Sequence, residues 1–75
     1  MEPETLARQV RARGLVILAV TRHRSAEDVL VVYLHGNAGQ WANDTAAGLV
    51  ADVPGVVAVA QTVQTPSILL VRVVC

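Results

Sequence analysis

Four polar side chains lie within otherwise apolar segments of this sequence and are the first candidates for chemistry: Tyr33, His35, Gln61 and Arg72. Histidine is a common acid–base group in proteins, which makes His35 a candidate, and the guanidinium of Arg72 can pair with a carboxylate. Two hypotheses follow. The four residues line a polar pocket for a small ligand, or they are rim residues that fix the register of a protein interface. We favour the interface.

The segment from His35 to Gly39 (HGNAG) follows an apolar run and is rich in glycine. It resembles the turn of α/β-hydrolases in which backbone N–H groups face a developing oxyanion. Hydrolase chemistry also needs a serine on a G-x-S-x-G elbow and a later histidine. Neither serine of this chain lies on such an elbow, and no histidine follows His35. We therefore predict a strand-to-helix turn capped by Asn37, with an anion site at Gly36, Asn37 and Gly39 as the alternative.

Other reactive groups are sparse. The single cysteine, Cys75, excludes an internal disulfide, and no Cys/His cluster suits a metal, so we expect no catalytic residues, no metal and no cofactor. Arg22, His23 and Arg24 form a small basic tip. The net charge is nevertheless zero and aromatic residues are few, so we expect no binding to nucleic acid.

The first residues and the apolar runs give an expectation for the cellular location of the protein. Glu2 and Glu4 occupy the region where a signal peptide needs positive charge, and the longest apolar run is far too short to span a membrane. We expect a cytoplasmic protein that does not bind membranes. The lysine-free, Arg-, Ala- and Val-rich composition is typical of high-GC genomes, such as those of bacteria and their phages.

Fifteen valines among 75 residues lie mostly in strand-like runs that are apolar at successive positions. Such runs predict a sheet that is buried on both faces. A single core of this size rarely supplies more than about 3–5 kcal/mol without disulfides, metal or oligomerisation. We expect self-association to cover the second face. The runs occupy residues 15–21, 29–35, 56–63 and 67–74.

Two segments favour helices, one from Glu2 to Arg13 and one from about Gln40 to Asp52. Pro3 suits a first helical turn, while Gly14 and Pro54-Gly55 suit the two ends. Residues 1–75 therefore form one α+β domain, a two-layer αββαββ sandwich with both helices on one face of a four-stranded, antiparallel-rich sheet. This order is that of a circularly permuted ferredoxin-like fold. The second and fourth strands are then expected to be central and parallel, the first and third to be edges, and the termini to meet.

The segment Val29–Val74, with its passage VADVPGVVAV, resembles the ferredoxin-like effector domains of the ACT and Lrp/AsnC type. This resemblance implies association through the sheets and small effectors bound at the interfaces. Gln64, Thr65 and Pro66 replace the glycine-aspartate turn expected between the last two strands of the Lrp type, so no effector residue is carried over.

We expect a small homo-oligomeric interaction or regulatory protein without catalytic activity, for instance a phage protein that binds a host protein. Its partners are then itself, as a dimer or higher oligomer through the sheet, and another protein. The first alternative is an effector-binding module of the ACT type. The second is a dimeric α+β-barrel enzyme that uses His35 and Arg72.

Overall fold

The computed structural model describes residues 1–35, 39–62 and 67–74, with only the backbone described for residues 39–43. Two helices and four strands follow one another in the predicted order αββαββ, and each boundary lies within about two residues of its expected place. The elements are α1 (Pro3–Ala12), β1 (Ile17–Arg22), β2 (Val29–Leu34), α2 (Gly39–Ala51), β3 (Val56–Gln61) and β4 (Ile68–Val73).

The strands form one open sheet in the order β1-β2-β4-β3, and every neighbouring pair is antiparallel. The prediction that β2 and β4 are central and that β1 and β3 are edges is confirmed. The prediction that β2 and β4 run parallel is wrong. The α2 crossover returns the chain so that β3 runs parallel to β2, and β4 lies between these two strands as the hairpin partner of β3. The strand β4 must therefore run antiparallel to both of them.

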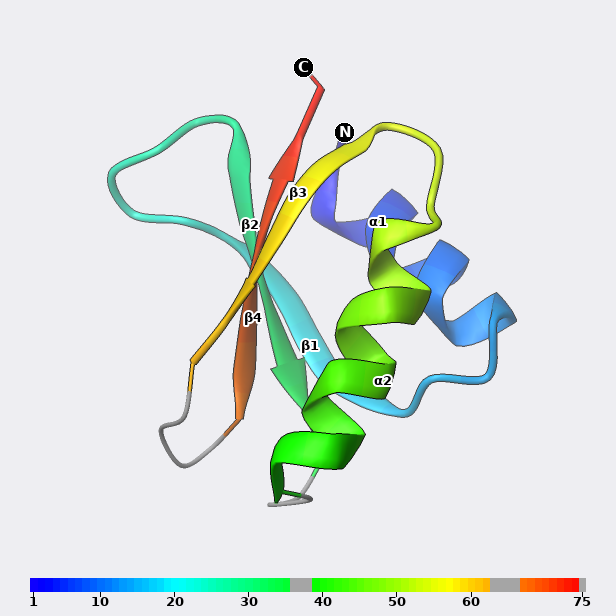
Figure 1. Ribbon diagram of the computed structural model, residues 1–75. Coiled ribbons are helices and arrows are strands. Elements are labelled where there is room, and N and C mark those ends of the chain that lie inside the picture. The colour runs from blue at the N-terminus through cyan, green and yellow to red at the C-terminus, as the bar shows by residue number, and fades with distance from the viewer. Residues whose placement is uncertain (36–38, 63–66, 75) are drawn as a thin grey trace.

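Both helices lie on the same face of the sheet, as predicted, and leave the other face without a helical layer (Figure 1). Proline occupies the first turn of α1, and Gly14 follows this helix with a φ of 87° that favours glycine. Gly55, with a φ of 95°, follows α2 and begins the path into β3. The sequence thus marks the helix ends with residues suited to them.

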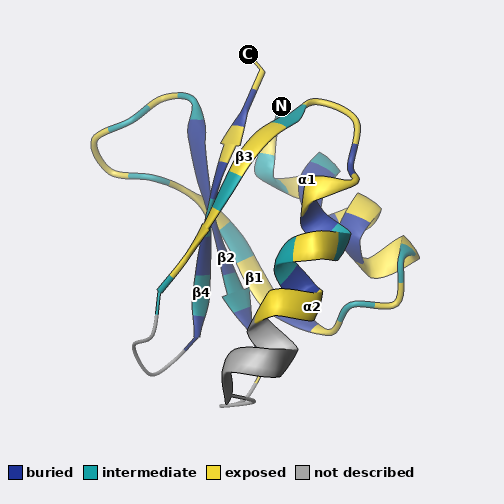
Figure 2. Ribbon diagram, in the orientation of Figure 1, coloured by how far each residue is buried: buried dark blue, intermediate teal, exposed yellow. Residues whose placement is uncertain are grey.

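The hydrophobic core lies between the helices and the sheet (Figure 2). Alternate residues of the two central strands supply six of its 13 described buried residues, since successive side chains of a strand point to opposite faces. On the helix side, α1 contributes Leu6 and Val10, and α2 contributes Ala46 and Val50. The strand residues in the core are Leu30, Val32 and Leu34 of β2 and Leu69, Val71 and Val73 of β4.

Each edge strand carries an irregularity near its beginning. The register of β1 against β2 shifts between Ile17 and Ala19, and that of β3 against β4 shifts between Val56 and Ala58. An extra residue of this kind changes which later side chains point to which face. The second shift has consequences for Gln61, described below.

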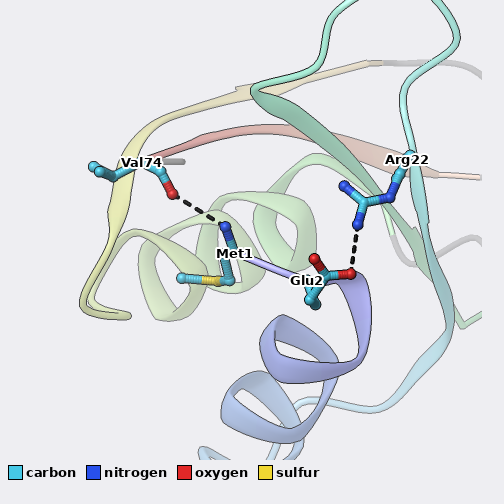
Figure 3. A network of polar contacts seen from close by, with 4 residues as sticks. All are labelled: Met1, Glu2, Arg22 and Val74. Atoms are coloured by element: carbon cyan, nitrogen blue, oxygen red, sulfur yellow. Dashed lines mark hydrogen bonds and ion pairs between the residues drawn. The ribbon is translucent and has the colours of Figure 1, made fainter.

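The chain ends lie side by side, as predicted (Figure 3). The Met1 amine donates a hydrogen bond of 3.1 Å to the carbonyl oxygen of Val74. In the next residue, the Glu2 carboxylate forms an ion pair with Arg22 at the end of β1. The start of α1 is thereby tied to both β4 and the β1 edge.

Candidate interaction surface on the open sheet face

The sheet face opposite the helices is built from three rows of side chains that cross the strands. Their neighbours along β2 and β4 belong to the core, so these residues point away from it. We call this surface the open face. Its rows are Ala19, Tyr33 and Ile68; Thr21, Val31, Leu70 and Ala60; and Val29, Arg72 and Ala58.

The open face is almost uncharged. Arg72 is the one ionisable cation or carboxylate within its three rows, and it forms an ion pair of 3.3 Å with Asp28. Both side chains are about half exposed, so solvent screens the pair and its contribution to stability is small, on the order of 1 kcal/mol or less. Its main effect is that a surface contacting the open face meets a neutralised charge rather than a bare guanidinium.

The connection between β1 and β2 curves outward on the same side as the open face, away from the helices (Figure 1). Its backbone is anchored where the His23 N–H donates to the Val29 carbonyl oxygen at 3.0 Å. The Ser25 N–H donates to Nδ1 of His23 at 3.1 Å, which holds the imidazole in a defined orientation. His23 thus becomes a fixed part of the wall beside the sheet.

This connection corrects the expectation that the open face lacks any cover from its own chain. Val29 and Val31 lie on that face and are nevertheless buried, with 9% and 7% of their surfaces exposed. His23 borders two hollows there. One, of about 380 Å³, is lined by Ala26, Val29 and Leu70 among others, and the second, of about 460 Å³, includes Val31 and Leu70. The loop therefore shelters one end of the open face.

The predicted polar residues do not form a single cluster. Tyr33 is half-buried in the first row, whereas Arg72 lies in the third row, opposite Val29. The two rows are four positions apart along β2, or about 13 Å at the usual rise of a strand. His35 is exposed in a bend after β2. Tyr33, His35 and Arg72 thus occupy separate positions on a surface, which favours the interface hypothesis over a single polar pocket.

The expectation that Gln61 shares one surface of the sheet with Tyr33 and Arg72 is wrong. Gln61 pairs with the core residue Leu69, and its side-chain amide donates to Oδ1 of Asp44 on α2 at 2.7 Å. The register shift between Val56 and Ala58 accounts for the error, since it places Val59 and Gln61 on the helix side and Ala58 and Ala60 on the open face. Gln61 links β3 to α2.

The predicted anion site falls mostly outside the described residues. Gly36 and Asn37 are not described, and Gly39 is the first residue of α2. The anion site and the Asn37 cap therefore remain predictions. Trp41 and Cys75 likewise have no described side chain.

A further hollow, of about 660 Å³, lies where the chain ends meet the β1–β2 connection. It is polar and carries both signs of charge, because Glu2 and Glu27 line it together with Arg22 and Arg24. Sequence reasoning identified the basic tip but not its pairing, since Glu2 and Arg22 are 20 positions apart. The Glu2 ion pair makes this hollow a mixed surface and not a basic one.

Sequence reasoning placed Leu70 on this face but missed the open-face residues of the two edge strands, among them Thr21, Ala58 and Ala60. Their period-two spacing is visible in the sequence, but the two register shifts hide the alternation in β1 and β3.

Among the described residues, no group of three or more His, Cys, Asp or Glu side chains is placed to hold a metal ion. No helix in the described part is long and apolar enough to cross a membrane.

Comparisons with models of known protein families, with curated proteins and with solved structures found no match.

Proposed function

We propose that this chain is a small, non-catalytic interaction protein that associates with a second copy of itself through the open face. The observation that carries the proposal is the composition of that face. Three rows of small or apolar side chains, broken by one internally paired arginine, stand opposite a face already filled by two helices. Burying such side chains against a partner is favourable, at about 25 cal/mol per Å² of apolar surface.

The charge of the open face favours a second copy over other partners. Nucleic acids and anionic membranes are attracted by clustered, unpaired cations, whereas Arg72 is paired with Asp28. In a two-fold symmetric contact the same surface occurs on both sides. Two neutral faces meet without opposing like charges, so the open face is compatible with itself.

The topology supports the same proposal. The order β1-β2-β4-β3 with adjacent termini is what a βαββαβ ferredoxin-like sandwich gives when its first strand follows the last one in sequence. We therefore assign the chain a circularly permuted ferredoxin-like fold. The ACT-type and Lrp/AsnC-type domains that residues 29–74 resemble associate through their sheets, in line with use of the open face.

One observation favours a second candidate function, that of an effector-binding module. The hollow of about 380 Å³ beside His23 is mostly apolar, and it includes Arg72 at its border. A small molecule with an apolar body and a carboxylate fits that chemistry. If the hollow binds such a ligand, the double change of Arg72→Met with Asp28→Asn abolishes the binding, although this double variant self-associates like the wild type.

The open-face contact is tested by placing a charge in its second row. We expect Leu70→Glu, and Thr21→Arg in the same row, to lower the solution mass relative to the wild type. Thr21 is exposed and lies on the face of β1 that points away from the core, so its replacement does not threaten the fold. Val16→Glu is the matched control, because Val16 is 67% exposed and lies outside the sheet. Equal masses for all four proteins, each folded by circular dichroism, would rule out the open face as the contact.

A further inference from the structure

The structure has a second surface suited to association, which is the outer edge of β3. Thr62 N–H donates to the Ile68 carbonyl oxygen at 3.3 Å, which identifies Thr62 and Ile68 as a hydrogen-bonded pair of the antiparallel ladder. Bonded and non-bonded pairs alternate. Val59, opposite Val71, therefore belongs to a non-bonded pair, and its N–H and C=O point away from β4. No strand of the described chain lies beyond β3.

This edge lacks the usual features that prevent edge-to-edge pairing. Natural edge strands are commonly protected by charged side chains or proline. From Val56 to Gln61, β3 has neither, and Val57 is 61% exposed. The register shift near Val57 affects only the beginning of the strand. The part from Ala58 onward remains regular enough to pair with another strand.

The opposite edge of the sheet differs in charge and in cover. The hydrogen bond from His23 to Val29 makes Arg22 and Leu30 a non-bonded pair, so the backbone of Arg22 faces outward from β1. Its guanidinium pairs with Glu2 at the start of α1 (Figure 3). The Arg22–Glu2 ion pair and the start of α1 thus lie at the outer edge of β1, where charge of this kind disfavours pairing with another strand.

We propose that β3 pairs antiparallel with β3 of a second copy, so that two sheets join into one across a two-fold axis at Val59. In that register Val59 lies opposite Val59 of the partner subunit, and each donates its N–H to the C=O of the other. Ala58 then lies opposite Ala60 of the partner subunit in a non-bonded pair. Such pairs bring Cα atoms to about 4.5 Å, a spacing that alanine side chains fit readily.

A second copy is the occupant that the charges favour. A head-to-tail contact of β3 with β1 would bring a neutral edge against Arg22 and Glu2, and its repetition would give an open filament. A contact of β3 with β3 opposes no charged side chains and closes on itself. This inference concerns the edge and does not depend on the open face, which is a separate surface.

The edge contact is tested locally by hydrogen exchange of the Val59 amide. In an isolated chain this N–H points to solvent and exchanges quickly. At a total protein concentration 100 times the dissociation constant of the edge contact, mass action leaves roughly 7% of the chains monomeric, so we expect protection on the order of 10-fold. Val57→Lys should remove that protection, whereas Val16→Lys, at a similarly exposed valine, should leave it. Rapid exchange of the Val59 amide in the wild-type oligomer overturns the proposal.

Solution masses separate this inference from the proposed function. If both contacts exist, Val57→Lys and Leu70→Glu each leave a dimer, and the double variant is a monomer of about 7.9 kDa. If Leu70→Glu alone gives the monomer and Val57→Lys has no effect, the edge contact is wrong and the open-face contact stands. The reverse pattern overturns the open-face contact and supports the edge.

Discussion

The junction between α2 and β3 offers a prediction whose size follows from backbone geometry. Gly55 has a φ of 95°, and a Cβ placed there would lie 2.7 Å from Cε of Met1. A non-glycine residue in such a conformation costs about 1–2 kcal/mol. The Met1 contact adds little, because the end of a flexible side chain can move aside. Gly55→Ala should therefore lower the free energy of unfolding by about 1–2 kcal/mol.

Two other glycines provide matched controls. Gly14 has a φ of 87°, and nothing lies within 4 Å of the place that an added Cβ would take, so Gly14→Ala isolates the backbone cost. Gly48 lies inside α2 with open space around it, and Gly48→Ala should stabilise the protein by about 0.5–1 kcal/mol. Thermal unfolding at one fixed protein concentration measures all three, since 1 kcal/mol shifts the midpoint by about 4–8 °C in a domain of this size.

The direction in which each variant shifts the thermal midpoint tests the assigned backbone conformations. Gly55→Ala and Gly14→Ala should both melt below the wild type, and Gly48→Ala should melt above it. A Gly55→Ala protein as stable as the wild type would refute the assigned conformation at the entry to β3. A much larger loss than that of Gly14→Ala would instead show that the Met1 side chain is held rigidly against this turn.

The remaining predictions concern the core and the charges. Leu69 is fully buried, so Leu69→Ala should cost about 2–5 kcal/mol in chemical denaturation, and an unchanged midpoint would contradict its place in the core. Arg72→Met should weaken self-association in sedimentation because it leaves the Asp28 carboxylate unpaired, and the double change with Asp28→Asn should restore it. Glu2→Gln should change stability by less than about 1 kcal/mol because its ion pair with Arg22 is exposed; a larger loss would show a structural role for the pair.

The sequence predicts the order of the elements well, because valine-rich runs and glycine or proline boundaries are local signals. It also places β2 and β4 at the centre, because the order αββαββ is interpreted as a permuted ferredoxin-like sandwich in which the second and fourth strands are central. It does not establish whether these strands run parallel, which depends on how α2 returns the chain. It cannot reveal the extra residue near Val57 either, because a valine in an irregular position looks like any other valine.

The surface residues were harder to predict for the same reason. Arg72 and Tyr33 lie in regular parts of β4 and β2, so the period-two rule places them correctly on the open face. Gln61 follows a register shift and lies on the helix side. The shelter that His23 gives to Val29 comes from a loop, whose path has no periodic signal in the sequence.

The mass of the wild-type protein in solution, measured by sedimentation over a series of concentrations, tests the central claim most directly. Self-association through the open face predicts a mass of at least twice the 7.9 kDa of one chain at micromolar concentration, falling toward 7.9 kDa on dilution. A folded monomer of 7.9 kDa throughout the series would contradict it.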